Sequence, residues 1–159
     1  MANLDRQTYK SSWNPNVAEM VIKAGDGNAL GTYTASVTIP EGSYLLDVQV
    51  HGVELWNAGA AELNVGSDGV VDDIWVDVNL KATDLLVNEV LSFHHQGSGS
   101  EQGALLTAAN GAMNQYRSGA RTITATIVTS SSLGTTGETR IMVMWAKPTD
   151  TTKSTFVAT

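Results

Sequence analysis

Apolar and polar residues alternate along much of the chain, and this alternation predicts short β-strands. In "YTASVTI" (33–39) the apolar side chains share one face of the strand, while Thr34, Ser36 and Thr38 share the other. A period of two is typical of a strand with one buried face, and β-branched residues favour this pleated geometry. The same pattern predicts further strands at residues 44–55, 61–66, 74–80, 89–95, 121–129 and 139–146.

The phase of the alternation predicts which side chains enter the core. In the second of these strands it places Leu46, Val48 and Val50 on one face. Trp75 and Trp145 lie within alternating strands, so we interpret both tryptophans as core residues.

Turns that contain glycine separate the predicted strands, and this spacing indicates an all-β fold. Seven short strands with such turns predict a single antiparallel β-sandwich or jelly-roll-like domain. Only residues 103–116 favour a helix, and the two glycines in that stretch weaken the interpretation. We assign the sandwich to residues 17–147, between an extended N-terminal arm (1–16) and a C-terminal tail (148–159).

The two ends differ in composition from the body of the chain. The N-terminal end contains "SSWNPN", a turn around Pro15 with the large aromatic residue Trp13, and the polar C-terminal end contains Phe156. One interpretation is a pair of frayed ends, which are common at chain termini. The other is a pair of arms that dock on a neighbouring subunit, with Trp13 and Phe156 as buried aromatic anchors.

The composition supports one folded domain and excludes several kinds of chemistry. The chain has 159 residues, of which 42% are hydrophobic, so it can bury a core. No apolar run is long enough to span a membrane, and the polar N-terminal stretch lacks the apolar core of a secretion signal. Cysteine is absent, which excludes disulfides, thiolate nucleophiles and cysteine-ligated zinc.

Charge is unevenly distributed along the chain, whose net charge is −7. Residues 1–25 carry three bases and two acids (+1), residues 26–101 carry one base and twelve acids (−11), and residues 102–159 carry five bases and two acids (+3). An acidic middle segment is repelled by polyphosphate, and no basic stripe with interleaved aromatic residues is present. We therefore expect no nucleic-acid partner.

Four aspartates, at positions 68, 72, 73 and 77, form the most concentrated candidate site. A calcium loop of the EF-hand type that starts at Asp68 fails at its third position. The simplest interpretation is a polar hairpin, with a turn from Gly66 to Gly69 and acids that face water. A calcium site that joins Asp68, Asp72 and a distant carboxylate stays open, as does a glycosidase pair of carboxylates matched in space. No other metal or cofactor is expected.

No complete catalytic signature is present, so we expect a protein that is not an enzyme. His51 lies beside Gly52, and His94 and His95 are neighbours on a predicted strand, so the side chains of this pair diverge. The chain contains no H-E-x-x-H motif, no G-x-S-x-G elbow and no G-x-x-x-x-G-K phosphate loop.

Trp56, in "ELWNAGA" at the end of a predicted strand, is the best candidate for an exposed aromatic contact. Exposed aromatic rings provide large contact areas for partners, and a row of them can stack on sugars. A carbohydrate-binding module is therefore an alternative class of function. The predicted partner-binding residues are Trp13, Pro15, Trp56 and Phe156.

Three stretches together resemble small virion proteins of tailed bacteriophages. They are "GTYTASVTIPEGSYLLDVQVHGVELWNAGAAELNVGSDG" (31–69), "VNLKATDLL" (78–86) and "TRIMVMWAKPT" (139–149). The shared pattern is an alternating strand, a T-[IL]-P-x-G turn, a second strand with an acid, and a strand that ends in "VG" before an acidic turn. The resemblance spans about residues 20–149, and it is a pattern of strands and turns, not a catalytic motif.

The resemblance implies a structural protein that decorates or cements the outer surface of the capsid. Its partner would be the major capsid protein, and the expected form is a homotrimer at a threefold or quasi-threefold position. Such a protein is assembled in the host cytoplasm and resides on the virion exterior, where an acidic surface faces solvent. The alternatives are a tail or head-fibre component that binds host surface glycans and, last, a polysaccharide-degrading enzyme of a phage tail.

Overall fold

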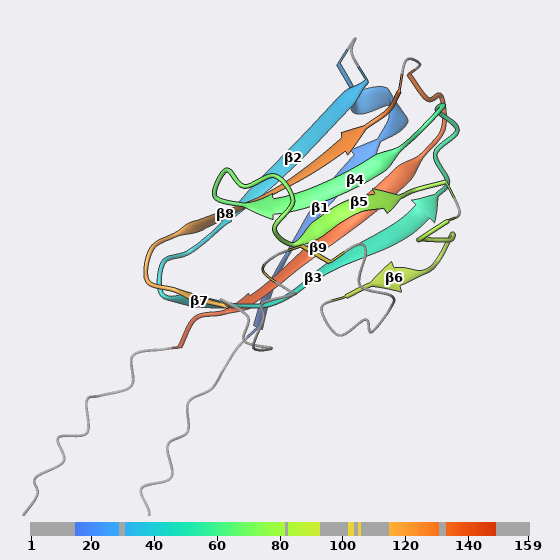
Figure 1. Ribbon diagram of the computed structural model, residues 1–159. Coiled ribbons are helices and arrows are strands. Elements are labelled where there is room, and N and C mark those ends of the chain that lie inside the picture. Colours follow the sequence, from blue (N-terminus) through green and yellow to red (C-terminus); the bar gives the residue numbers. More distant parts are fainter. Residues whose placement is uncertain are drawn as a thin grey trace, which may run out of the picture.

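The structure, a computed structural model, describes most of the chain between Pro15 and Pro148 (Figure 1). The described residues are 15–28, 31–81, 83–92, 102–103, 105, 115–130 and 133–148. Trp13, Phe156 and the His94–His95 pair lie outside them. Most of the predicted helix at 103–116 also lies outside them, and the residues of this stretch that are described are not helical.

Nine β-strands and one short 3-10 helix form the described part of the chain. The strands are β1 (Pro15–Lys23), β2 (Thr32–Ile39), β3 (Ser43–Glu54), β4 (Glu62–Ser67), β5 (Trp75–Asn79), β6 (Val90–Leu91), β7 (Tyr116–Arg117), β8 (Arg121–Val128) and β9 (Glu138–Ala146). The helix, η1, spans Ala24–Asp26. Among the described residues, no helix is long and apolar enough to cross a membrane. Two of the strands, β1 and β7, were not predicted from the sequence.

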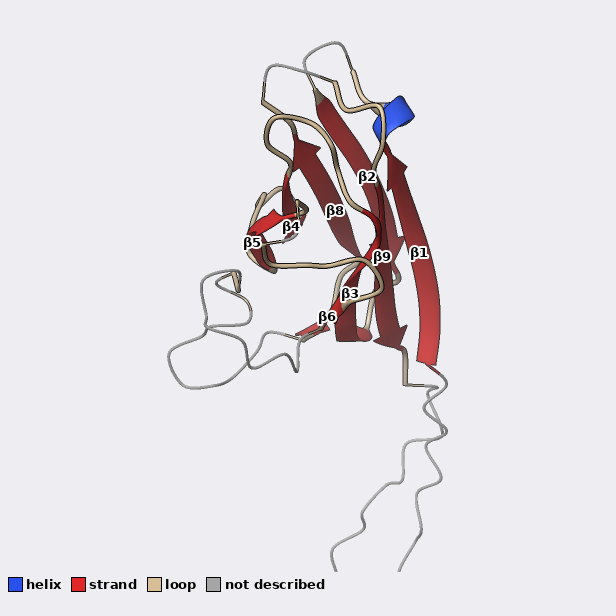
Figure 2. Cartoon of the chain, turned by 90° about the vertical axis from the view of Figure 1, so that its right-hand side faces the viewer, coloured by secondary structure: helices blue, strands red, loops and turns tan. Residues whose placement is uncertain are grey.

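The strands form two antiparallel sheets that pack face to face (Figures 1 and 2). The β1 sheet has the order β1–β9–β3–β6, with β7 also paired to β3, and the β2 sheet has the order β2–β8–β4–β5. β1 lies against β2 across the sandwich, and the Trp75 indole of β5 donates a hydrogen bond to the Val48 carbonyl of β3 (2.9 Å). The strand orders of the two sheets therefore correspond, with β1 near β2 at one side of the sandwich and β3 near β5 toward the other. The predicted all-β sandwich is confirmed.

Apolar side chains from the inner faces of both sheets form one core. β8 shows the pattern clearly, since Ile123, Ala125 and Ile127 are fully buried while the threonines between them lie on the outer face. Trp75 is buried, and Trp145 packs against the core from a partly buried position. The alternation that predicted the strands thus also placed these side chains correctly.

Strand β3 departs from the predicted phase at a β-bulge. Its register with β9 shifts between Leu45 and Asp47, so that Leu45, and not Leu46, is buried. Val48 and Val50 are buried as predicted. The expectation for Leu46 is wrong because the extra residue of a bulge interrupts the alternation, and the residues before and after it follow opposite phases.

Candidate interaction surfaces

Both terminal segments leave the sandwich at the same end. Pro15, the first residue of β1, pairs with Ala146, the last residue of β9. β1 therefore begins within the range assigned to the N-terminal arm, and Pro15 is an exposed strand residue. We call this end of the sandwich the terminal end, and define it by the Pro15–Ala146 pair and the two tyrosines beside it.

The two tyrosines of the terminal end come from neighbouring strands. Tyr44 of β3 pairs with Ala146 on one side and with Tyr116 of β7 on the other. The two rings are tilted by 44° with their centroids 4.8 Å apart, and Tyr116 is 48% exposed. Tyrosine is enriched at protein interfaces. The sequence did not reveal this pair, because the two-residue strand β7 has no alternation to identify it.

Asp68 joins the two sheets near the terminal end. Its carboxylate accepts hydrogen bonds from the Thr122 backbone N–H (2.9 Å) and from Arg117 Nη1, and it lies 4.0 Å from Arg121 Nε. Asp68 lies in the β4–β5 turn of the β2 sheet, whereas Arg117 belongs to β7, which pairs with the β1 sheet. The backbone φ of Asp68 is 51°, a left-handed conformation that aspartate tolerates better than most residues.

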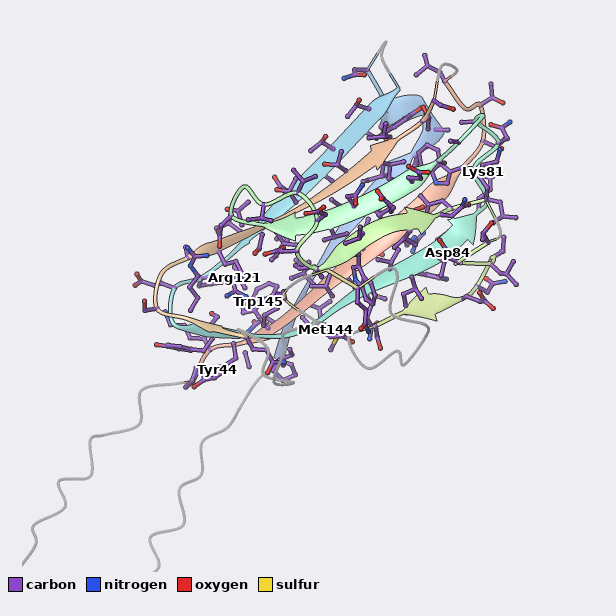
Figure 3. The ribbon with its side chains drawn as sticks, viewed as in Figure 1. Tyr44, Lys81, Asp84, Arg121, Met144 and Trp145 are labelled. Carbon is purple, nitrogen blue, oxygen red and sulfur yellow. The ribbon has the colours of Figure 1, made fainter. Side chains whose placement is uncertain are left out.

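Arg121, the first residue of β8, is labelled in Figure 3. It is buried near this carboxylate, with 2% of its surface exposed. Burial lowers the pKa of the Arg121 guanidinium, the charge of Arg117 lowers it further, and the Asp73 carboxylate opposes both effects. Asp73 in turn accepts hydrogen bonds from the Ser67 backbone N–H (2.8 Å) and hydroxyl (2.5 Å). The contacts of Asp68 and Asp73 therefore stabilise the position of the β4–β5 turn, so we assign these carboxylates a structural role.

The four aspartates of the cluster have different surroundings within the described part of the chain. No group of three histidine, aspartate or glutamate side chains suited to a metal ion occurs there. Asp72 is exposed, and Asp77 exchanges two hydrogen bonds with Asn64 (2.9 and 3.1 Å). The predicted turn forms at Asp68–Gly69. Three of the four acids, Asp68, Asp72 and Asp77, are exposed as the polar hairpin predicts, whereas Asp73 is partly buried. Exposure does not leave them all without protein contacts, because protein donors also hold the carboxylates of Asp68 and Asp73.

Trp56 is 2% exposed, so the expectation of an exposed contact at this position is wrong. Its indole N–H donates to Thr139 Oγ1 (2.9 Å), and the Tyr33 ring meets it edge-on at a centroid distance of 4.9 Å. Gly137 makes room for the indole, since a Cβ at that glycine would lie 2.5 Å from the ring. Trp56 is therefore not available to stack on a sugar, and it does not support the glycan-binding alternative.

Charge divides the sandwich into two sides. Strands β1, β2, β8 and β9 together carry Lys23, Arg121, Arg140, Glu19 and Glu138. Residues 41–92, which contain β3 to β6, carry ten acidic side chains and one lysine. Because the first four strands lie together on one side of both sheets, the molecule has a near-neutral side (β1, β2, β8, β9) and an acidic side (β3, β4, β5, β6).

On the near-neutral side, the outer face of the β2 sheet is an array of hydroxyl groups. Thr38 lies opposite Thr122, and their hydroxyl oxygens are 3.1 Å apart. Two further pairs of hydroxyl residues follow along the same two strands, Ser36 with Thr124 and Thr34 with Thr126. Cross-strand pairs of this kind stabilise a sheet and leave its surface polar but uncharged.

The outer face of the β1 sheet, in contrast, combines ion pairs with exposed valines. Glu138 lies 3.1 Å from both Lys23 and Arg140, and Arg140 lies 3.6 Å from Glu19. Hydrogen bonds from Lys23, then Arg140, lower the pKa of the Glu138 carboxyl. On β1, Val17 and Val21 are 57% and 38% exposed. His51 of β3 lies opposite Arg140 and is partly buried.

The fold is similar to that of chains in bacteriophage capsids. It matches a chain of the cyanophage Pam1 capsid asymmetric unit with a TM-score of 0.60 and 16% identity, over 92% of this chain and 94% of that one. It matches a chain of the acid-stable capsid of Helicobacter pylori bacteriophage KHP30 with a TM-score of 0.55 and 14% identity, over 85% and 89% of the two chains. No family model and no curated protein matches the sequence. At these identities the similarity establishes a shared fold.

Proposed function

We propose that the chain is a non-enzymatic structural protein of a bacteriophage virion, which binds the outer surface of the capsid as a decoration or cement protein. The fold shared with chains of the Pam1 and KHP30 capsids is the observation that carries this proposal. The matched regions make up at least 85% of each chain, so the similarity concerns whole chains of comparable length and not a common fragment.

The terminal end is the surface that we assign to attachment. Residues 1–14 and 149–159 both join the sandwich there, because Pro15 and Ala146 are paired. The exposed Tyr116 adds an aromatic contact beside them, and the two segments carry Trp13 and Phe156 as further anchors. Two segments that depart from one end can grip the same partner, which we propose is the major capsid protein.

The acidic side supports an exterior position on the capsid. Its ten acidic side chains would be repelled by packaged nucleic acid, whereas on the outside they face solvent and counterions. The homotrimer implied by the resemblance to phage virion proteins stays a prediction, and sedimentation equilibrium of the full chain tests it.

Attachment to assembled shells tests the proposed function. Shells of the major capsid protein are incubated with the chain and pelleted, and the retained chain is measured beside the temperature at which the shells break. We expect retention and a higher breaking temperature. Removal of residues 1–14 should reduce both. Shells that do not retain the chain, or that break at the same temperature with and without it, would contradict this function.

A point substitution separates the terminal end from the rest of the surface. Tyr116→Ala should weaken shell binding by about tenfold, since truncation of an interface tyrosine commonly costs this much. Val128→Ala is the matched control, because Val128 is similarly exposed (45%) but lies at the end of β8 in the other sheet. Equal binding of the two variants would assign attachment to another surface.

A further inference from the structure

Strand β1 presents an edge that no other strand covers in the described part of the chain. It is longer than β2, β5, β6 and β7, the other strands at the edges of the two sheets, and it pairs with β9 through nine consecutive residues without a register shift. Exposed edges are usually protected by prolines, lysines or bulges within the strand. In β1, Pro15 and Lys23 stand at the two ends, Glu19 is the one charged residue of the interior, and the pairing with β9 has no bulge. The interior of this edge therefore remains open to pairing with a further strand.

The side chains of β1 suit the addition of such a strand. Met20 and Ile22 point into the core and are buried, whereas Val17 and Val21 are exposed on the outer face. A strand placed beside β1 would continue the apolar inner layer next to Met20 and Ile22 and would cover Val21. Main-chain hydrogen bonds supply affinity in this mode of recognition, and the alternate side chains supply specificity.

The distribution of charge favours a second copy of the chain as the strand that pairs with the β1 edge. Each copy carries a net charge of −7, so two copies that meet through their acidic sides repel each other. The near-neutral side, where β1 forms the edge, is the region in which two copies can approach without that repulsion.

We propose that β1 pairs antiparallel with β1 of a second copy around a twofold axis at Val21. In this register Glu19 of each copy lies opposite Lys23 of the other, which is a favourable cross-strand pair. Lys23 lies 3.1 Å from Glu138 of its own chain, so each lysine would stand between two carboxylates. A register centred on Glu19 would instead oppose two glutamates, which is unfavourable. The contact is separate from attachment at the terminal end and does not depend on the capsid function.

Single cysteines test the register directly, because the chain has no cysteine of its own. Val21→Cys should form a disulfide-linked dimer under mild oxidation, since only the axis position brings two copies of one side chain together. We expect it to cross-link about ten times faster than the controls, whose Cβ atoms stay outside disulfide range. Val17→Cys is more exposed on the same strand, and Val90→Cys is similarly exposed on β6 at the opposite edge of the β1 sheet. Equal rates for the three variants would overturn the proposal.

A second substitution tests the same contact without covalent chemistry. Val21→Lys places two like charges at the axis and should raise the dissociation constant for self-association by about tenfold or more, measured by sedimentation equilibrium. Val90→Lys should leave it unchanged. A chain that stays monomeric throughout the concentration series, or self-association that Val21→Lys does not weaken, would also overturn the proposal.

Discussion

Asp68 illustrates how a single side chain can have a role that its sequence neighbourhood does not show. Within "GSDG" it reads as a turn residue on a wet surface. In the folded chain its carboxylate faces Arg117 and the buried Arg121, and it accepts the Thr122 backbone N–H. A buried arginine needs a nearby negative charge, since an uncompensated charge in the interior is costly. Asp68 supplies that charge from the β4–β5 turn of the same sheet, more than 50 residues earlier in the chain.

Replacement of this carboxylate should therefore destabilise the fold. Asp68→Asn keeps a side chain that tolerates positive φ and can still accept the Thr122 N–H, but it removes the charge that faces two arginines. We expect a loss of about 1–2 kcal/mol in the free energy of unfolding, less than for a fully buried pair because Asp68 is partly exposed. Urea unfolding measures it.

Asp72→Asn is the matched control for that measurement. Asp72 is an exposed acid of the same hairpin, so its replacement should change the free energy of unfolding by less than about 0.5 kcal/mol. Equal stability of the two variants would show that the Asp68 carboxylate does not compensate Arg121.

Among the secondary-structure elements, β1 shows why alternation did not predict a strand at residues 15–23. A strand is recognised when its outer face is polar, and the outer face of β1 carries Val17 and Val21 beside Glu19. With Met20 and Ile22 on the inner face, apolar residues occur on both faces and the period of two is lost. The exposed Val21 lies at the edge that is proposed to pair with a second copy.

The ion pairs between β1 and β9 should make the pKa of Glu138 sensitive to Lys23. Because the folded-state pKa is lowered, the stabilisation from Glu138 is fully present above its unfolded value of about 4.3 and is lost as the pH falls through the folded value. Lys23→Ala should raise the pKa of Glu138 toward its ordinary value, and a carboxyl-carbon NMR titration measures it.

The exposed Lys147, which follows β9, provides the control for this titration. Lys147→Ala removes the same charge from the chain without removing the 3.1 Å contact between Lys23 and Glu138. If both variants shifted the pKa of Glu138 equally, net charge and not the specific ion pair would be its cause.

Across the whole molecule, charge follows the order of the strands in the two sheets. Acidic side chains gather on β3 to β6 and their connections, while β1, β2, β8 and β9 are close to neutral. Like charges crowded on one side weaken the folded state at low ionic strength, and salt screens them. The effect of cations on the acidic side should therefore depend on their charge and concentration.

We accordingly expect calcium to act on this protein as any divalent salt does. Calcium and magnesium at the same millimolar concentration should give the same melting temperature, because the Asp68 carboxylate is occupied by Arg117 and the Thr122 N–H. Thermal unfolding monitored by circular dichroism measures the melting temperature in each salt. A rise specific to calcium would reveal a site, since a ligand that binds only the folded state stabilises it.

Local pattern was sufficient for seven of the nine strands that the structure describes, for the sandwich class and for the core positions on β8. The reason is that alternation and turn chemistry act within a few residues. Long-range packing was needed for the rest. Three features depend on which strands become neighbours. They are the bulge that buries Leu45, the space that Gly137 leaves for the Trp56 indole, and the contact between the Tyr44 and Tyr116 rings. The division into a near-neutral and an acidic side arises in the same way, since sheet order brings together charges that are distant along the chain.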